Sequence, residues 1–334
     1  MSRLFARAVL PALLLFAAAP LGQAIAADKG QSTFTAAADA GPDYKVQGEY
    51  VGELTINGEP RKVGMQVIAL GDGKFDAEGY PGGLPGDGWN KDAGRRHRSG
   101  ETKDGVTTIS GEGPTGKLVD GVITVTGADG AKIGTLKRVE RKSPTLGAKP
   151  PADAIVLFDG TSVDKWNGGR LADGGLLAAG CISKDSFRDF QLHIEFQTPF
   201  MPAARGQGRG NSGVYLQNRY ELQVLDSFGL DGKDNECGGF YSIQAPAVNM
   251  CYPPLTWQTY DIDFTAARFD DAGKKTKNAI VSVRHNGVPI YENFELPKLT
   301  PGGLPQEAPG VGPFQLQNHG NPVYYRNIWI VEKK

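Results

Sequence analysis

The sequence predicts an all-β chain made of two β domains, and three observations predict it. Apolar and polar residues alternate along most of the chain, without sustained helical periodicity. Glycine and proline are abundant, with 46 and 22 residues among 334, and they divide the chain into short segments. The pairs Asn57–Gly58 and Asn286–Gly287 each stand between alternating segments, where an Asn-Gly pair is a strong signal for a β-hairpin. We therefore expect many short antiparallel strands with almost no helix.

The first residues have the features of a secretory signal peptide, which we predict over residues 1–26. Arg3 and Arg7 precede the apolar run Ala8–Ala19, and Ala24–Ile25–Ala26 fits a small-residue cleavage site. The run is too short for a membrane-spanning helix, and no other segment predicts a membrane span. We expect export to a periplasm or to the outside of the cell. Residues 27–44 are rich in Ala, Asp, Ser and Thr and predict a flexible leader.

Residues 45–141 predict a small antiparallel β domain whose role the sequence leaves open. Its basic cluster, Arg95 to Arg98, is interpreted as an exposed loop, and no set of residues here is typical of a catalytic site. The expected strands are Tyr50–Ile56, Arg61–Ala69, Lys74–Gly79, Val106–Ser110, Val122–Thr126 and Lys132–Val139.

Residues 142–152, KSPTLGAKPPA, predict a linker, and residues 153–334 predict the second domain. About ten strands with long connections are typical of two packed antiparallel sheets in a jelly roll. The expected strands are Ile155–Phe158, Leu176–Ile182, Phe190–Gln197, Gly213–Gln217, Tyr220–Leu225, Gln258–Phe264, Ala279–His285, Val288–Tyr291, Phe314–Gln317 and Tyr324–Val331.

Charge and cysteine content limit the classes of function. The net charge of −1 gives no support for nucleic-acid binding, and nothing in the sequence sets the oligomeric state. Export would permit a disulfide between Cys237 and Cys251, whereas Cys181 lies in an apolar run and is expected to be buried. No C-x-x-C spacing predicts metal binding by cysteine.

The stretch from Arg205 to Phe228 carries the candidate site. A glycine-rich loop leads into two strands with a tight turn at Asn218–Arg219. Residues two apart in a strand share a face, so Glu221 and Gln223 point the same way. Asp226 would need a β-bulge to join them. The loop matches G-x-G-x-x-G, but a strand follows where dinucleotide binding needs a helix, so that interpretation is rejected.

Several long motifs of the second domain resemble the DUF1080 family, also called the 3-keto-disaccharide hydrolase domain. The resemblance covers Asp153–Lys334 and implies a concanavalin A-like jelly roll. The motifs are LFDGTSVDKWNGG, FRDFQLHIEFQTPF, GQGRGNSGVYLQNRYELQVLDSFG, CGGFYSIQAPAVN, WQTYDIDFTAARFD and LQNHGNPVYYRNIWI.

The resemblance implies an enzyme that cleaves glycosides already oxidised to a ketone at sugar carbon 3. Such a ketone acidifies the hydrogen at C2, so that a base can remove it and the C1 substituent can leave; water then adds. That chemistry needs a general base and a group that stabilises the enolate. Two alternatives remain open: a conventional jelly-roll glycosidase and a non-catalytic carbohydrate-binding module.

The candidate catalytic residues are Glu221 and His319, either of which could be the base, together with Asp226. The strand resembles the E-x-D-x-x-E strand of jelly-roll glycosidases, but the middle acid is replaced by Gln223. No cofactor is expected with certainty; Glu221 and Asp226 could hold a divalent cation through oxygen. Trp257 and Tyr220 could stack on a sugar or belong to the core. The expected substrate-binding residues are Asn211, Gln217, Arg219, Tyr220, Gln223, Trp257 and Asn321.

Overall fold

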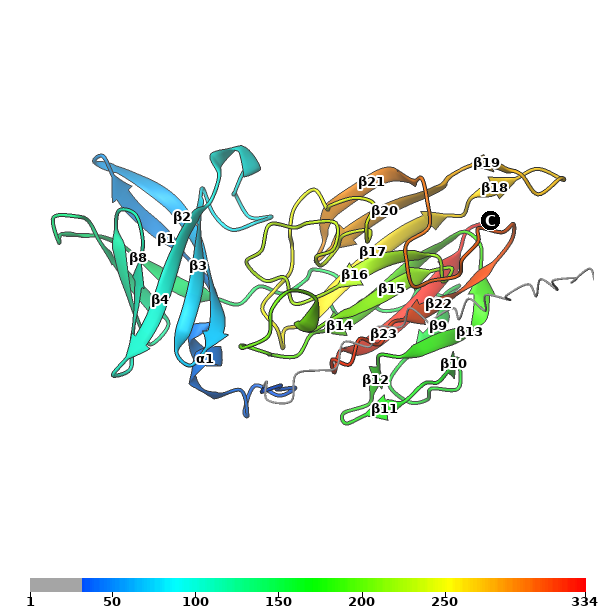
Figure 1. Ribbon diagram of the computed structural model, residues 1–334, viewed down its shortest axis with the longest axis horizontal. Helices are drawn as coiled ribbons and strands as arrows, with labels where there is room; N and C mark the ends of the chain where they lie inside the picture. The colour runs from blue at the N-terminus through cyan, green and yellow to red at the C-terminus, as the bar shows by residue number, and fades with distance from the viewer. Residues whose placement is uncertain (1–31) are drawn as a thin grey trace, which may run out of the picture.

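The computed structural model describes residues 32–334, and strands make up most of this part of the chain. Its one α-helix is short: α1 (Gly41–Val46). Figure 1 shows two bodies along the long axis, a blue-to-cyan barrel at one end and a larger green-to-red sandwich at the other. The all-β prediction is confirmed. No helix in the described residues is long and apolar enough to cross a membrane, and the predicted signal peptide lies outside them.

The first body is a closed barrel of eight strands that pair in chain order, with β8 returning to β1. Asn57, Asp104 and Asp120 have positive φ and each precedes a glycine, which fits the tight hairpins expected there. The strands are β1 (Gly48–Ile56), β2 (Glu59–Gly71), β3 (Lys74–Pro81), β4 (Arg96–Lys103), β5 (Val106–Ser110), β6 (Thr115–Val119), β7 (Val122–Thr126) and β8 (Lys132–Val139), with a 3-10 turn at Lys91–Ala93.

The second body is a sandwich of a five-stranded and an eight-stranded sheet. The five-stranded sheet has the order β10-β13-β22-β15-β16, and the other has the order β11-β12-β23-β14-β17-β20-β21, with β9 beside β23. The elements are β9 (Ile155–Phe158), β10 (Trp166–Asn167), β11 (Leu171–Ala172), β12 (Leu176–Ala178), β13 (Cys181–Phe187), β14 (Phe190–Gln197), a 3-10 turn (Gly206–Gly208), β15 (Ser212–Leu216), β16 (Tyr220–Val224), β17 (Gln258–Thr265), β18 (Arg268–Phe269), β19 (Lys275–Lys277), β20 (Ala279–His285), β21 (Val288–Leu296), β22 (Gly312–Leu316) and β23 (Tyr324–Glu332).

Side chains from each body are anchored in the other. Arg141, at the end of the barrel, pairs with buried Glu49 at 2.5 Å and lies over the ring of Tyr252 in the sandwich, 4.9 Å from its centroid. Arg209 of the sandwich donates to the carbonyl oxygen of Ala69 in β2 at 3.1 Å. Buried Phe200 belongs to the hydrophobic core of the barrel. The barrel is therefore packed against the sandwich by buried ionic, polar and apolar contacts.

The residues before the barrel differ from the expected flexible leader where the structure describes them. Phe34 exchanges two backbone hydrogen bonds with Phe200, at 2.9 and 3.0 Å. The helix α1 follows directly, and Tyr44 packs edge-on against the Phe200 ring. These apolar contacts hold residues 34–46 against both bodies.

The three cysteines are buried and free, so the structure does not contain the expected disulfide between Cys237 and Cys251. The sulfur atom of Cys237 lies 3.2 Å from the Tyr260 hydroxyl. The Cys251 thiol is 3.5 Å from the carbonyl oxygens of Leu225 and Tyr252. Each sulfur is thus accommodated as a thiol with polar partners. Cys181 is buried, as expected.

Candidate active site

A buried carboxylate lies on the outer face of the five-stranded sheet. In the hairpin β15–β16, Tyr215 is directly opposite Glu221 and Gly213 is opposite Gln223. The intervening Leu222 and Val224 enter the sandwich core, so period-2 alternation directs Glu221 and Gln223 outward. The prediction that Glu221 and Gln223 share a face agrees with this register.

The Glu221 side chain is held by its cross-strand neighbours. Its Oε2 accepts a hydrogen bond from the Tyr215 hydroxyl at 2.9 Å. A Cβ atom at Gly213 would collide with its Oε1, so the carboxyl group needs the glycine opposite Gln223. Glu221 is only 3% exposed. Burial raises the pKa of Glu221 to about 7, and the hydrogen bond from Tyr215 partly offsets the increase.

Amide side chains surround this pair. Gln317 follows β22 and donates through Nε2 to the Tyr215 hydroxyl at 3.1 Å. Gln207 Oε1 accepts from Asn211 at 3.2 Å and from Gln223 at 3.3 Å. The side-chain oxygens of Asn211 and Gln317 are buried without a hydrogen-bond partner in the described part of the chain. Buried polar atoms are usually satisfied, so these two oxygens are candidates to bind water or a polar ligand.

Two loops cover the hairpin that carries Glu221. Tyr241, in the loop that follows β16, donates its backbone N–H to the carbonyl oxygen of Glu221 at 3.2 Å. The Thr300 hydroxyl accepts from the backbone N–H of Glu221 at 2.8 Å. The Tyr215 hydroxyl also lies 2.7 Å from the carbonyl oxygen of Pro301. These contacts remove the carboxyl group from bulk water, which is the cause of its raised pKa.

Asn321 joins the cluster, and His319 lies on the exposed turn beside it. The side-chain oxygen of Asn321 accepts from the backbone N–H of Asn211 at 2.8 Å. Within residues 32–334 the His319 ring has no hydrogen-bond partner, and partial burial lowers its pKa. His319 comes two residues after Gln317 on the same chain segment. The structure therefore joins Gln223, Asn211 and Asn321 through hydrogen bonds, and Glu221 lies on the same hairpin face as Gln223.

Asp226 is not part of this cluster. Its buried Oδ2 accepts from Nε of Arg209 at 2.6 Å, and its Oδ1 accepts from the backbone N–H of Phe228 at 3.3 Å. The strand β16 ends at Val224, so no bulge returns Asp226 to the face of Glu221. The ion pair anchors the loop whose arginine reaches the barrel. A catalytic role beside Glu221 is therefore contradicted by this geometry.

Two predicted ligand-binding residues organise the end of the hairpin instead. Gln217 donates to the carbonyl oxygen of Phe187 at 2.8 Å. Arg219 donates to Oε1 of Gln217 at 3.1 Å and to the carbonyl oxygen of Gln306 at 3.3 Å. Both side chains are buried. Their hydrogen-bonding groups hold neighbouring loops in place, which opposes the prediction that they bind substrate.

Tyr220 and Trp257 lie away from the Glu221 face. Tyr220 alternates into the sandwich core, where it packs near Phe264, and its hydroxyl donates to Glu307. Trp257 carries the guanidinium of Arg326 over its ring, 4.0 Å from the centroid. Tyr220 was expected either to stack on a sugar or to belong to the core, and the structure places it in the core. Neither ring is placed to stack on a sugar beside Glu221.

The described residues contain no group of three or more His, Cys, Asp or Glu side chains that could hold a metal ion. Glu221 and Asp226 were the expected oxygen ligands. The Asp226 carboxylate is occupied by Arg209, so the two acids do not form a shared donor set.

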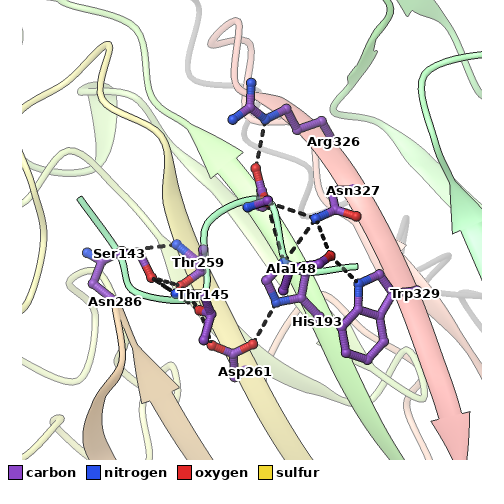
Figure 2. Close-up of polar contacts among 12 residues, drawn as sticks. Ser143, Thr145, Ala148, His193, Thr259, Asp261, Asn286, Arg326, Asn327 and Trp329 are labelled. Carbon is purple, nitrogen blue, oxygen red and sulfur yellow. Dashed lines mark hydrogen bonds and ion pairs between the residues drawn. The ribbon is translucent and has the colours of Figure 1, made fainter. Parts of the chain in front are cut away.

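A second buried polar cluster lies on the outer face of the eight-stranded sheet. His193 in β14 is 1% exposed; its Nδ1 lies 2.6 Å from Oδ1 of Asp261 and its ring stacks on Trp329. Glu195 accepts from Arg326 at 2.7 Å and from Asn327 at 2.9 Å. Figure 2 shows these side chains converging beneath the chain that links the two bodies.

The linker covers this cluster and is fixed by it. The backbone N–H of Gly147 donates to Glu195 at 2.5 Å, and the Thr145 hydroxyl donates to Asp261 at 2.6 Å. The carbonyl oxygen of Ala148 accepts from Asn327 at 3.0 Å and from Trp329 at 3.2 Å. The alternation of His193 and Glu195 predicts a polar sheet face. The linker covers this face, so both side chains are buried. The cluster is thus a structural clamp.

Sequence reasoning missed three residues around Glu221: Tyr215, Gln317 and Gln207. Tyr215 lies in a predicted strand and is recognised only when the hairpin register is known. Gln317 belongs to the quoted LQNHGN motif, two positions before His319, and that nearness in sequence is the available signal. Gln207 is in an irregular loop, and no local pattern indicates it.

The comparisons with known proteins agree with this fold. The model of the 3-keto-alpha-glucoside-1,2-lyase-like domain matches residues 153–331. A crystal structure of a candidate glycosyl hydrolase from Parabacteroides distasonis ATCC 8503 is 36% identical, with a TM-score of 0.51; the match covers 55% of this chain and 85% of that one.

A second candidate glycosyl hydrolase from Parabacteroides distasonis ATCC 8503 is 18% identical, with a TM-score of 0.41 over 55% of this chain and 94% of that one. No curated protein matches the chain. The family match takes in every sandwich strand from β9 to β23 except the last residue of β23, and with it the whole Glu221 cluster. The chain therefore belongs to the 3-keto-alpha-glucoside-1,2-lyase-like domain family, as the DUF1080 motifs indicated.

Proposed function

We propose that this protein is an exported enzyme that cleaves 3-keto-glycosides, with Glu221 as the general base. One observation carries the proposal: a buried carboxyl group whose pKa is raised to about 7 lies on a sheet face lined by amides. A base is most effective when its pKa is near the working pH, and an ordinary glutamate is too weak for the task at neutral pH. The family description, a 1,2-lyase-like domain, supports chemistry at C1 and C2 of the sugar.

The proposed reaction has two balanced steps. Glu221 takes the proton from C2, which the neighbouring C3 ketone has acidified; a C1=C2 double bond forms and the aglycone leaves C1 with its oxygen. The leaving oxygen gains a proton. Water then adds across the double bond, with its hydroxyl going to C1 and a proton returning to C2. The net result is hydrolysis of the glycoside, and no oxidant is needed because the substrate arrives as a ketone.

The neighbours of Glu221 fit the other requirements of this chemistry. Negative charge develops on the C3 oxygen, and hydrogen-bond donors aimed at such an oxygen are a large source of rate enhancement. Gln317 provides an amide N–H next to Tyr215 and Glu221, with a second amide proton not used in its bond to Tyr215. The unpartnered oxygens of Asn211 and Gln317 can accept from sugar hydroxyls. We assign Asn321 to the positioning of Asn211, because it binds the backbone there.

A conventional retaining glycosidase is disfavoured because, within residues 32–334, no second carboxylate contributes to the electrostatics of Glu221. Retaining enzymes hold two carboxyl groups roughly 5–5.5 Å apart. The pKa of Glu221 responds to burial and to Tyr215, with no contribution from another acid. Asp226, the expected partner, is neutralised by Arg209.

The substrate test uses a chromogenic glucoside oxidised at C3 and its unoxidised parent, with aglycone release as the readout. We expect release from the ketone alone. Release from both at similar rates would instead indicate an ordinary glycosidase, and saturable binding without release would indicate a binding module. Reaction in D2O adds a test of mechanism, because elimination and hydration must place deuterium at C2. Product without deuterium at C2 would contradict the proposed base.

Export rests on the signal-peptide pattern of residues 1–26. N-terminal sequencing of the chain recovered from a periplasmic fraction should begin after Ala26. Recovery of the intact Met1 terminus, in the cytoplasm only, would contradict export.

A further inference from the structure

The barrel is filled at one end and hollow at the other. At the end that faces the sandwich, Tyr50, Phe75 and Phe200 of its core cluster are at most 1% exposed. The segment from Phe34 to α1 packs over the same end. The opposite end, beside the turn of the β1–β2 hairpin, contains a cavity lined by residues that include Thr55, Ile56 and Pro60.

A cavity of about 1580 Å³ opens at this end of the barrel. Aliphatic side chains from several strands line it: Ile109 and Ile123 are buried, whereas Ile56, Val63 and Ile133 are accessible. Small-molecule pockets typically occupy roughly 300–1,000 Å³, so the space is ample for one ligand. Eight-stranded barrels can hold a small molecule inside, and the walls here are suited to an apolar body.

Two arginines lie on the inward-facing side of β4 at the mouth of the cavity, where Arg96 is exposed and Arg98 is half-buried. Gly100 on the same strand is buried against Phe75 and Ile109, so the alternation of β4 directs Arg96 and Arg98 to the interior and His97 outward. Opposite them on β3 stand the smallest residues, with Gly79 paired to Arg96 and Ala77 paired to Arg98. Both arginines therefore line the cavity beside small neighbours. The expectation that Arg95 to Arg98 form a loop is wrong, because β4 begins at Arg96, whereas Arg96 and His97 are exposed as expected.

The positive charge at the mouth of the cavity is not neutralised. Lining residues Lys62 and Arg95 pair with Asp87 and Asp231. Among residues 32–334, Arg61, Arg96 and Arg98 make no ion pair within 4.0 Å.

The hydrogen bonds of Arg96 and Arg98 go to carbonyl oxygens, those of Arg95 and Glu112. The one acidic residue that lines the cavity is Glu112. Burial and the charge of Arg96 lower the pKa of Arg98, while Glu112 acts in the opposite direction. Like charges gathered at an apolar cavity without paired carboxylates are the arrangement expected for binding an anion.

We propose that the barrel binds an amphipathic carboxylate, with its apolar body in the cavity and its carboxylate between Arg96 and Arg98. The apolar walls account for the body of the ligand and the unpaired arginines account for its charged end. A neutral apolar molecule would leave the charges of both arginines unpaired, and a small polar anion would leave the accessible side chains of Ile56, Val63 and Ile133 uncovered. The site is separate from Glu221 and would function as a carrier or sensor site beside the catalytic body.

The test uses the mature full-length protein and 11-(dansylamino)undecanoic acid, a fluorescent fatty acid, with its methyl ester as the neutral analogue. We expect saturable binding of the acid at one site and at least tenfold weaker binding of the ester. The double variant Arg96→Gln/Arg98→Gln should bind the acid at least tenfold more weakly and bind the ester as the wild type does, because charge-assisted hydrogen bonds are worth roughly tenfold or more each. Displacement by oleate would assign an acyl chain, and displacement by cholate a fused-ring body.

The matched control is Lys117→Gln/Lys137→Gln, which removes two charges from the exposed outer face of the same barrel. It should leave binding of the acid unchanged, as should Glu221→Gln in the sandwich. Equal binding of acid and ester, no saturable binding, or equal losses in the two double variants would overturn the proposal. Circular dichroism of each variant would establish that the barrel is folded.

Discussion

The hydroxyl oxygen of Tyr215 lies 2.9 Å from Oε2 of Glu221, the residue directly opposite it in the β15–β16 pair. The same hydroxyl is 2.7 Å from the Pro301 carbonyl oxygen and accepts a hydrogen bond from Gln317. It has a single proton to share between the carboxylate and the carbonyl. Tyr215 therefore fixes the direction of Glu221 and moderates its basicity without neutralising it.

Replacing Glu221 with Gln should abolish most of the aglycone release from a 3-keto-glucoside. The amide keeps the size and the hydrogen bond to Tyr215 but cannot take a proton. Loss of a general base typically lowers the rate roughly 100- to 10,000-fold. Single-turnover kinetics with saturating substrate measure the chemical step directly.

The control for that variant is Glu292→Gln, which removes a carboxylate from an exposed position of β21. Its rate should equal that of the wild type. If Glu221→Gln retained more than a tenth of the wild-type rate, the base would have to be sought elsewhere, and His319→Ala is the variant to examine next.

Tyr215→Phe should shift the pH dependence of the reaction. The hydrogen bond from Tyr215 lowers the pKa of Glu221, so its removal raises that pKa further above 7. Because the base acts only when deprotonated, the acidic limb of the pH–rate profile should move to higher pH. The profile of kcat/KM from pH 5 to pH 9 measures the shift. An unmoved limb accompanied by a uniform loss of rate would mean that Tyr215 acts on the substrate and not through Glu221.

The sequence predicts which residues share a face of one strand better than it predicts which residues lie opposite them on the neighbouring strand. Period-2 alternation correctly places Glu221 beside Gln223. The expected two-residue turn at Asn218–Arg219 would pair Gln217 with Tyr220, whereas Leu216 pairs with Tyr220 around three turn residues. That shift of one residue brings Tyr215 opposite Glu221, and a register of this kind depends on turn geometry that local sequence does not specify.

Long-range pairing accounts for the other differences. Asp226 is removed from the site by Arg209, and the same arginine reaches Ala69 in the barrel. No local pattern contains that contact. The strand β4 was missed because its sequence, RHRSGETK, has no apolar residue to mark an inner face. Its inner face carries Arg96 and Arg98, so the absence of the usual signal is itself a consequence of the charged cavity.

His193→Asn should destabilise the protein more at pH 6 than at pH 9. Burial opposes the charged ring, but the hydrogen bonds that the ring donates to Asp261 and Glu195 outweigh it and raise the pKa of His193 above 6.5. A group whose pKa is raised in the folded state contributes to the free energy of unfolding. That contribution is fully present below the pKa of the unfolded state and is lost as the pH rises through the pKa of the folded state. Urea unfolding at the two pH values measures the difference. His97→Asn, at a ring whose side chain is 61% exposed, is the control; a larger cost of His193→Asn at pH 9 would contradict a charged clamp.

Glu221→Gln should stabilise the protein at alkaline pH while it removes activity. The folded-state pKa of Glu221 is raised from 4.5 to about 7 by burial. Between these values the folded state holds a proton that the unfolded chain has lost, so the contribution of this residue to stability falls as the pH rises and is lowest above pH 7. The difference of about 2.5 pKa units corresponds to about 3 kcal/mol of unfolding free energy. Chemical unfolding should therefore show the variant more stable than the wild type by up to that amount at pH 8, with the gap closing near pH 4. A variant less stable than the wild type at pH 8 would mean that interactions in the folded state stabilise the Glu221 carboxylate more than burial destabilises it. The raised pKa on which the proposed base depends would then have no physical cause.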